Sequence, residues 1–106
     1  MIKRVWHGWT TPGNADAYEA LLQESVFPGI EAKTIPGYRG IELLRRDLGE
    51  EVEFITVMTF DSLASVTAFQ GEDYERAYVP EEARKVLRRW DERSAHYELR
   101  AQRQAG

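Results

Sequence analysis

Residues 51–60 read EVEFITVMTF, and this stretch decides the fold. β-Branched and aromatic residues dominate it, which is typical of a β-strand. Successive side chains of a strand point to opposite faces, so the apolar residues at even positions point one way while Ile55 and Val57 point the other way. Both faces of this strand are apolar, and both need a cover in the folded protein.

The segments around this strand predict a hairpin and a further strand. Residues 38–47 form another extended run, joined to 51–60 by Leu48-Gly49-Glu50, a connection short enough for a β-hairpin. Residues 2–10 are again rich in β-branched and aromatic types and end at the turn sequence Thr11-Pro12-Gly13-Asn14. We therefore expect three strands of one sheet here.

A helix is expected between the first strand and the hairpin. Asn14 is placed to cap it, and its apolar residues recur at the three- and four-residue spacing that gathers them on one face. These residues are Tyr18, Leu21, Leu22 and Val26. The proline and glycine of Phe27-Pro28-Gly29 predict that the helix ends there.

A second helical region is expected after the hairpin. Asp61 or Ser62 can cap it, and Gly71 suits its C-terminal end. Pro80, followed by two glutamates, predicts that a helix restarts and runs to Trp90. The inward residues expected for the two pieces are Leu63, Val66 and Phe69, followed by Ala83, Val86, Leu87 and Trp90.

The C-terminal part of the chain predicts the last strand. Apolar and polar residues alternate along residues 94–101, and residues 102–106 form a polar tail. The order of elements is then β-α-β-β-α-β, an α+β fold of the ferredoxin-like type with a four-stranded antiparallel sheet and its helices on one face. A chain of 106 residues has the size of one domain, which we place at residues 1–101.

The face of the sheet without helices needs a cover of its own. An antiparallel sheet with one face in water alternates between apolar and polar residues. Here the first strand instead places Val5 and Trp9 on one face and Ile2 and Trp6 on the other. A large exposed apolar patch marks an interface, and a two-fold homodimer covers it with one self-complementary surface. We therefore expect two copies that pack sheet against sheet.

Composition and charge exclude several classes of partner. Eighteen acidic and 14 basic residues give a net charge of −4, the wrong sign for binding nucleic acid. The chain has no cysteine, so disulfides and thiolate-bound metals are excluded, and we expect no metal site. No run approaches the ~20 apolar residues of a membrane helix, and the first residues do not resemble a signal peptide. We expect a cytoplasmic protein that binds neither nucleic acid nor membrane.

Four short stretches carry a family resemblance. They are residues 5–10 (VWHGWT), 37–40 (GYRG), 54–63 (FITVMTFDSL) and 92–98 (ERSAHYE). Together they resemble the antibiotic biosynthesis monooxygenase-like domains of the dimeric α/β-barrel superfamily. The resemblance implies an architecture rather than a chemistry, because this family includes cofactor-independent quinol oxygenases, haem-degrading enzymes and isomerases.

The resemblance implies an apolar pocket between the sheet and the helices, where a quinol-like or polycyclic aromatic molecule lies. A deprotonated phenol or quinol gives electrons to O₂ itself, so a cofactor-independent monooxygenase needs a shaped cavity, a proton acceptor and donors for the oxyanion. Haem-degrading members use an Asn on the first strand and a Trp and a His on the second helix, where this chain has Trp6, Phe69 and Val79. No histidine on that helix can ligate iron, and we expect no cofactor.

The candidate catalytic residues are His7 and His96, because only imidazoles change charge near neutral pH without help. The candidate substrate-binding residues are Trp6, Trp9, Tyr38 and Tyr74. Each has a structural alternative, as a histidine hydrogen-bonded in a core or interface or as an aromatic residue packed in the core. Gly8 either makes room for a ligand or marks a bulge. The two imidazoles are neighbours only if the register of the outer strands allows it, and the sequence does not reveal that register.

Two functions of other classes stay open on this evidence. An isomerase or lyase of the same fold would use His96 or His7 to move a proton without O₂, and O₂ consumption distinguishes it from an oxygenase. A non-catalytic dimeric accessory protein would bind a small molecule without turnover. A cavity too small or too closed for an aromatic ligand would count against catalysis, as would a lack of turnover across a panel of quinols.

Overall fold

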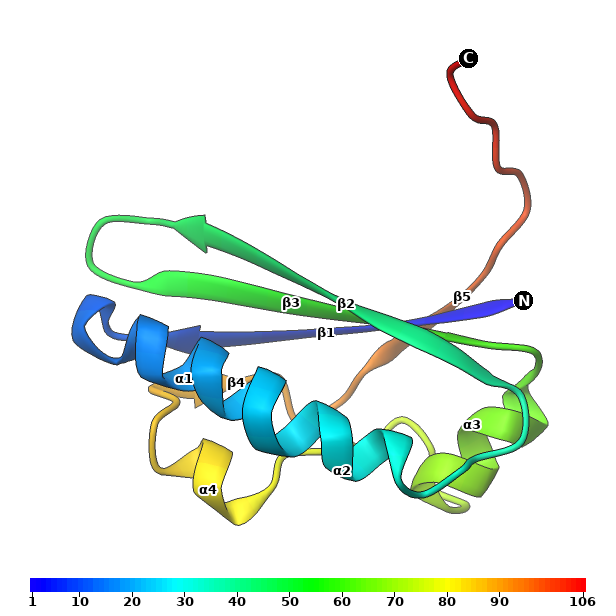
Figure 1. The fold of residues 1–106 in the computed structure, drawn as a ribbon, viewed down its shortest axis with the longest axis horizontal. Coiled ribbons are helices and arrows are strands. Elements are labelled where there is room, and N and C mark those ends of the chain that lie inside the picture. Colours follow the sequence, from blue (N-terminus) through cyan, green and yellow to red (C-terminus); the bar gives the residue numbers. More distant parts are fainter.

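The computed structural model describes all residues, 1–106, and contains one antiparallel sheet with its helices on one face (Figure 1). The strands are β1 (Ile2–Thr10), β2 (Tyr38–Asp47), β3 (Val52–Phe60), β4 (Arg89–Trp90) and β5 (Ala95–Glu98). Their order is β2-β3-β1-β4, and β5 also pairs with β1. Because β4 pairs with one end of β1 and β5 with the other, the two form one interrupted strand. The predicted ferredoxin-like α+β fold is confirmed, with its last strand in two pieces.

The pairing of β1 with β3 explains the glycine inside β1. The register is unbroken from Ile2 opposite Phe60 to Thr10 opposite Val52, so Gly8 does not mark a bulge. A Cβ atom built on Gly8 would lie 2.4 Å from Cη2 of Trp6. Residues two apart on a strand share a face, and the Trp6 indole occupies the space that a side chain at position 8 would need.

The first helical region is longer than predicted. It consists of a 3₁₀ turn η1 (Pro12–Asn14), α1 (Ala15–Leu21), a π-helical segment η2 (Leu22–Val26) and α2 (Phe27–Glu31). The helix was expected to end at Pro28, because a proline ring clashes with the carbonyl four residues earlier in a regular α-helix. That carbonyl belongs to Glu24, inside the π-helical segment, and the helix continues past the proline. Asn14 stands at the cap position, but its side-chain amide donates to the Val86 carbonyl at 3.3 Å instead of capping the helix.

The second helical region is shorter than predicted. Helix α3 (Leu63–Gln70) has the expected caps, because Ser62 Oγ accepts a hydrogen bond from the Ser65 amide and Gly71 adopts a positive φ. Helix α4 (Glu81–Arg84) ends well before Trp90, which lies in β4. Residues beyond the helix are needed for pairing with β1: the Arg88 amide donates to the Trp9 carbonyl at 2.8 Å. Leu63 was expected to point inward but is 43% exposed.

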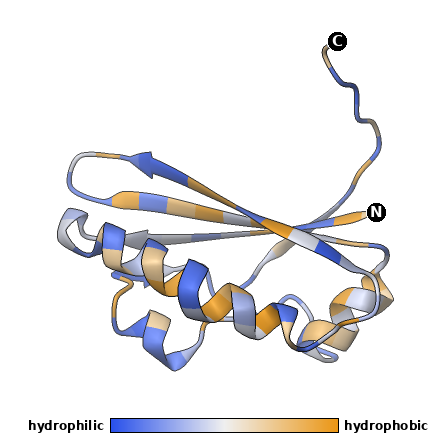
Figure 2. Cartoon of the chain, in the orientation of Figure 1, coloured by the Kyte–Doolittle hydropathy of each residue, from blue (hydrophilic) through white to orange (hydrophobic).

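The hydrophobic core lies between the helices and the facing side of the sheet. Even-numbered residues of β1 and β3 point into it, as the alternation predicts. Its buried apolar residues are Ile2, Trp6, Ala15, Tyr18, Leu22, Val26, Ile30, Val52, Phe54, Met58, Phe60, Val66, Phe69, Ala83 and Leu87. In Figure 2 hydrophobic colours run along the middle of β3, whereas the end of β2 is hydrophilic. Arg4 is the charged exception on this side of β1, and it is buried.

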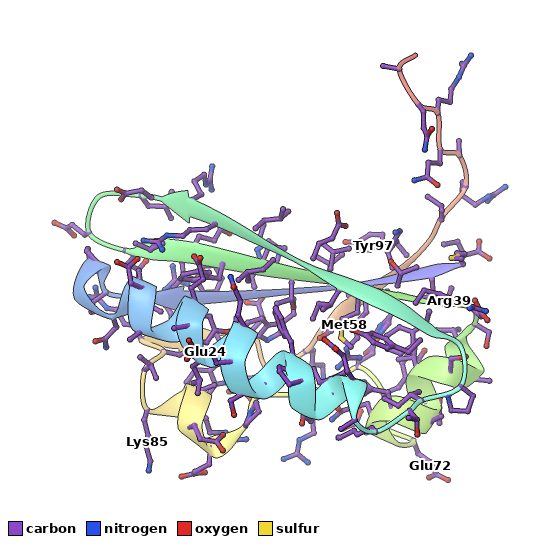
Figure 3. The ribbon with its side chains drawn as sticks, viewed as in Figure 1. Glu24, Arg39, Met58, Glu72, Lys85 and Tyr97 are labelled. Carbon is purple, nitrogen blue, oxygen red and sulfur yellow. The ribbon has the colours of Figure 1, made fainter.

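The opposite face of the sheet carries no helix (Figure 1). The register places Val5 beside Val57 at its centre, and both are partly exposed. Two larger apolar side chains lie around them: Leu44 is 50% exposed and Tyr97 is 58% exposed. Figure 3 shows Tyr97 above the sheet, on the side away from the helices. We call this surface the open face.

The C-terminal strand is shorter than predicted. Pairing extends over β5, after which the Leu99 amide donates to the Met1 carbonyl at 2.9 Å. Residues 99–106 have no regular secondary structure and run away from the sheet (Figure 1). None of the helices has the length and apolar composition needed to cross a membrane.

Candidate functional site

A cavity lies between the sheet and the helices. Met58, which points from β3 toward α2 in Figure 3, is one of its walls. The other lining residues come from β1 (Arg4, Trp6), the first helical region (Tyr18, Leu22, Val26, Phe27, Ile30), β2 and β3 (Ile41, Thr56) and the C-terminal half (Tyr78, Val79, Pro80, Ala83, Ser94). The cavity is thus built from every layer of the fold, and each wall comes from a different part of the sequence.

The lining of the cavity is mostly apolar. Eleven of its 15 residues are hydrophobic, and four of these are aromatic: Trp6, Tyr18, Phe27 and Tyr78. Tyr18 packs edge to face on Phe54, with ring centres 4.9 Å apart, and its burial raises the pKa of the phenol. Arg4, Thr56 and Ser94 supply the polar side chains. Apolar walls with a few fixed polar groups are typical of a site for a small organic molecule.

The cavity is narrow. Its volume is about 40 Å³. One water needs roughly 10–15 Å³, whereas a cavity that holds benzene measures about 150 Å³. The cavity as it stands has room for a few waters but not for an aromatic ring, so its size counts against catalysis unless one of its walls moves.

Arg4 lies at the polar end of the cavity and is held by neutral partners. Its Nη1 donates to the Tyr74 carbonyl and lies 2.9 Å from His96 Nε2, and its Nη2 donates to the Arg76 carbonyl at 2.8 Å. Burial lowers the pKa of Arg4 to about 10, so the guanidinium stays charged at pH 7. The side chain is a fixed cation in an apolar wall.

The contact with Arg4 decides the state of His96. A guanidinium only donates hydrogen bonds, so Nε2 of His96 accepts and the imidazole is neutral with its proton on Nδ1. Burial, and then the charge of Arg4, lower the pKa of His96, which agrees with a neutral ring. Nδ1 is buried and has no hydrogen-bond partner. His96 stands behind Arg4 and is not part of the cavity wall.

The structure separates the two candidate histidines. His96 pairs with Arg4 and points to the helix side, whereas His7 has the other parity and lies on the open face. There His7 Nδ1 donates to Glu53 at 3.0 Å, and Arg46 binds the same carboxylate at 2.9 Å. These two contacts lower the pKa of Glu53 against the effect of its burial. The two imidazoles are not neighbours, and His7 does not line the cavity.

The candidate aromatic residues divide in the same way. Trp6 lines the cavity, and its indole Nε1 donates to the Asp91 carbonyl at 2.8 Å. Trp9 lies on the open face, where the Arg89 guanidinium carbon is 3.9 Å from its ring centre. Tyr38 packs against Phe60 with ring centres 5.6 Å apart, outside the cavity lining. Tyr74 packs edge to face on His96 and gives its carbonyl to Arg4, but it does not line the cavity either.

Trp6 is the only candidate among the 15 lining residues, and the other 14 were not predicted; Arg4, Tyr18 and Ser94 are three of them. One signal in the sequence points to Arg4. It lies two residues from both Ile2 and Trp6, so it shares their face of the strand, and a charged residue on a buried face is unusual. Tyr18 looks like any core residue of an amphipathic helix. Ser94 lies between β4 and β5, in a break of the last strand that the sequence does not predict.

Comparisons with known proteins agree with this architecture. The sequence profile of the family "Antibiotic biosynthesis monooxygenase" matches residues 1–81. A crystal structure from Bacillus cereus, of a protein with a provisional assignment as an antibiotic biosynthesis monooxygenase, superimposes with a TM-score of 0.68 over 99% of this chain and 96% of that one. The two sequences are only 11% identical, so the superposition shows a shared fold and nothing about function. No match was found among curated protein sequences.

The profile covers well over half of the chain, and the protein belongs to the antibiotic biosynthesis monooxygenase family. The matched region ends at residue 81, before β4 and β5. Of the residues that bind Arg4, His96 lies outside the part of the chain that the family profile describes, whereas Tyr74 and Arg76 lie inside it. Ser94 also lies outside that part.

Proposed function

We propose that this protein is a cofactor-independent monooxygenase that acts on a quinol-like or polycyclic aromatic molecule in the cavity between sheet and helices. One observation carries the proposal: the cavity is walled by aromatic and aliphatic side chains and has its polar groups in Arg4, Thr56 and Ser94. Membership of the family supports it. Apolar walls of this kind suit an aromatic ring once the cavity has widened, and the hydroxyl of the ring then has polar partners.

The proposed reaction needs no reductant. A phenol with a free para position reacts with O₂ to give a quinone and water. One oxygen atom of O₂ becomes the new carbonyl oxygen. The other becomes the oxygen of water and takes one hydrogen from the para carbon and one from the hydroxyl. The substrate supplies all the electrons. The protein has to bind the ring, remove the hydroxyl proton and stabilise the oxyanion that gives electrons to O₂.

The residues on the helix side have defined roles in this proposal. Trp6 is a fixed wall, because its indole is tied to Asp91. Arg4 binds the substrate oxygen. His96 is the proposed proton acceptor, because it is the only imidazole on this side of the sheet; its Nε2 lone pair becomes available when the substrate oxygen replaces it at Arg4. His7 has no role in the chemistry, because it lies on the open face.

The cavity has to widen for an aromatic ring, and residues 78–80 form the wall that we propose moves. This segment lies between α3 and α4 without regular secondary structure. Neither the Tyr78 nor the Val79 amide donates to another backbone carbonyl. Apart from Ala83 in α4 and Ser94 before β5, the other lining residues belong to the sheet or to the long first helical region, whose backbone hydrogen bonds resist displacement.

We also propose that two copies pair through the open face. Val5, Ile55 and Val57 are partly exposed at its centre, and half or more of Leu44 and Tyr97 is exposed. The helices cover only the other face (Figure 1). An isologous dimer buries this apolar surface against itself. The cavity lies within one subunit, so the dimer supports the fold and adds no residue to the proposed reaction.

The test uses 1-naphthol, which this reaction converts to 1,4-naphthoquinone. With ¹⁸O₂ we expect one labelled oxygen in the quinone and one O₂ consumed per product. Two matched pairs locate the chemistry: Trp6→Leu and His96→Gln should lower kcat/KM about tenfold or more, the loss of roughly 1.4 kcal/mol of transition-state stabilisation. Trp9→Leu and His7→Gln, on the same sheet but on the open face, should keep it.

Each other result points to a different function. Proton exchange or isomerisation of the substrate without O₂ uptake would identify an isomerase. Binding of 1-naphthol without any product would identify an accessory binding protein. Equal losses in the His7 and His96 variants would contradict the proposed place of the reaction.

A further inference from the structure

Arg4 carries a buried positive charge that no acidic group of the protein neutralises. Its side chain is only 2% exposed. None of the ion pairs of the protein includes it. Its three hydrogen-bond partners are the carbonyls of Tyr74 and Arg76 and the neutral imidazole of His96. Charged residues are rarely buried without a counter-charge, because burial removes the water that stabilises them.

Lys33 places a second positive charge beside the Phe69 ring that Arg4 contacts. The Arg4 guanidinium carbon lies 5.6 Å from the ring centre of Phe69, and Lys33 Nζ lies 5.4 Å from the same ring. The carboxylate that acts on His96 is Glu75, but its Oε1 lies 3.8 Å from Arg93 and its side chain is more than half exposed. The electrostatic potential at this end of the cavity is therefore positive.

Ser94 is a second, independent observation that points to a ligand at this end of the cavity. Its side chain is among the cavity walls and 4% exposed, and Oγ has no hydrogen-bond partner. A buried hydroxyl without a partner costs free energy, and such groups are uncommon in folded proteins. Arg4 also has unused hydrogen-bond donors, because a guanidinium has five N–H groups and the three hydrogen bonds of Arg4 use only three of them. A ligand oxygen that accepts hydrogen bonds would satisfy both side chains.

We propose that the cavity binds its ligand as an aromatic oxyanion, with the negative oxygen at Arg4 and Ser94 and the ring among the apolar walls. This inference rests on the proposed function for the choice of a phenol as substrate. The bound form is then the phenolate, which is also the form that gives electrons to O₂. A nearby cation favours the charged form of an acid, so binding lowers the pKa of the phenol itself. Arg4 thereby activates the substrate, and His96 positions Arg4 through Nε2 until the substrate oxygen takes its place.

The first test is a spectroscopic titration of 4-nitrophenol, whose phenolate absorbs visible light, with excess protein. We expect the bound probe to ionise at least about one pH unit below the free probe, which corresponds to about tenfold tighter binding of the phenolate than of the phenol. Benzoate and benzamide have similar shape and differ in charge, and benzoate should bind at least about tenfold more tightly. Neither measurement depends on turnover.

Matched variants attribute the preference to Arg4. Arg4→Met should abolish both preferences, and Arg39→Met should keep them, because Arg39 is an exposed arginine that binds Asp61 on the surface. Two further variants keep the test decisive if Arg4→Met does not fold. Arg4→Lys retains the charge and should keep the preference for benzoate, and Ser94→Ala should weaken benzoate binding about fivefold, the value of one hydrogen bond.

The outcomes distinguish this inference from the proposed function. Equal binding of benzoate and benzamide, with an unshifted titration of 4-nitrophenol, overturns the oxyanion site and leaves the oxygenase standing. Tight benzoate binding by a protein that does not oxidise 1-naphthol supports the oxyanion site and contradicts the oxygenase. Failure of every probe to bind overturns both.

Discussion

Substituting Gly8 by alanine tests how β1 builds the cavity. The added Cβ would lie 2.4 Å from Cη2, 2.9 Å from Cζ3 and 3.1 Å from Cζ2 of Trp6. Ordinary contact begins near 3.4 Å, so the closest atom has to retreat by about 1 Å. The Trp6 ring cannot yield freely, because its Nε1 is bound to the Asp91 carbonyl and the residue is buried.

The cost of Gly8→Ala follows from these contacts. Overpacking of a core costs about 1–3 kcal/mol, and loss of the hydrogen bond to Asp91 adds about 1 kcal/mol. Alanine also lowers the conformational entropy of the unfolded chain, which stabilises the folded state by about 0.5–1 kcal/mol. We expect a net loss of about 2 kcal/mol in the free energy of unfolding. For a domain of this size that lowers Tm by roughly 8–16 °C.

Urea unfolding, thermal unfolding and a double-mutant cycle measure this effect. Gly29→Ala is the control, because a Cβ there meets nothing within 4 Å and alanine favours the helix by about 0.5–1 kcal/mol. In the cycle, the smaller side chain of Trp6→Leu leaves room for the new methyl group. Gly8→Ala should therefore cost at least about 1 kcal/mol less in the Trp6→Leu background than in the wild type. A wild-type midpoint for Gly8→Ala, or zero coupling with Trp6→Leu, would refute this account of the glycine.

Three further predictions concern the open face, His96 and a helix cap. Leu44→Asp should turn the proposed dimer into a monomer in sedimentation, whereas Leu63→Asp, with similar exposure on α3, should not; a wild-type that sediments as a monomer would contradict the dimer. The pKa of His96 is lowered in the folded state, so the unfolded chain binds the proton first, and the free energy of unfolding should fall as pH drops below about 6.5 by up to about 1.4 kcal/mol per pH unit. His96→Gln should flatten that slope in denaturant titrations at several pH values; parallel curves would argue against it. Ser62→Ala should cost about 1 kcal/mol in urea unfolding, because the Ser65 amide loses its acceptor, and an unchanged midpoint would show that the cap contributes nothing.

The strands were predictable because their signal is local. The hairpin of β2 and β3 lies within one residue of the predicted runs, since alternation and a glycine turn need no knowledge of the rest of the chain. The same parity rule places Trp6 on the buried side and Val57 on the open face. Helix ends were less predictable: Pro28 does not end the first helical region, because the π-helical segment before it admits the ring.

The site was only partly predictable. Trp6 lines the cavity, whereas the other candidates do not: His7, His96, Trp9, Tyr38 and Tyr74. Parity alone could have separated Trp6 from His7 and Trp9, because neighbouring residues of one strand point to opposite faces. Tyr74 could not be placed, because it precedes an irregular segment whose path depends on its pairing with residues 92–94.

The sequence by itself determined the order of the elements apart from β4, the parity of β1, β2 and β3 and the apolar character of both faces of the sheet, because these depend on residues a few positions apart. Only the tertiary structure decided that Arg4 meets His96 and the carbonyls of residues 74 and 76. Those contacts join positions about 70 to 90 residues apart, and they depend on the register of β5 on β1 and on the break between β4 and β5. Register is set by the packing of the whole domain, so a buried cation beside an apolar cavity emerges only when the chain is folded.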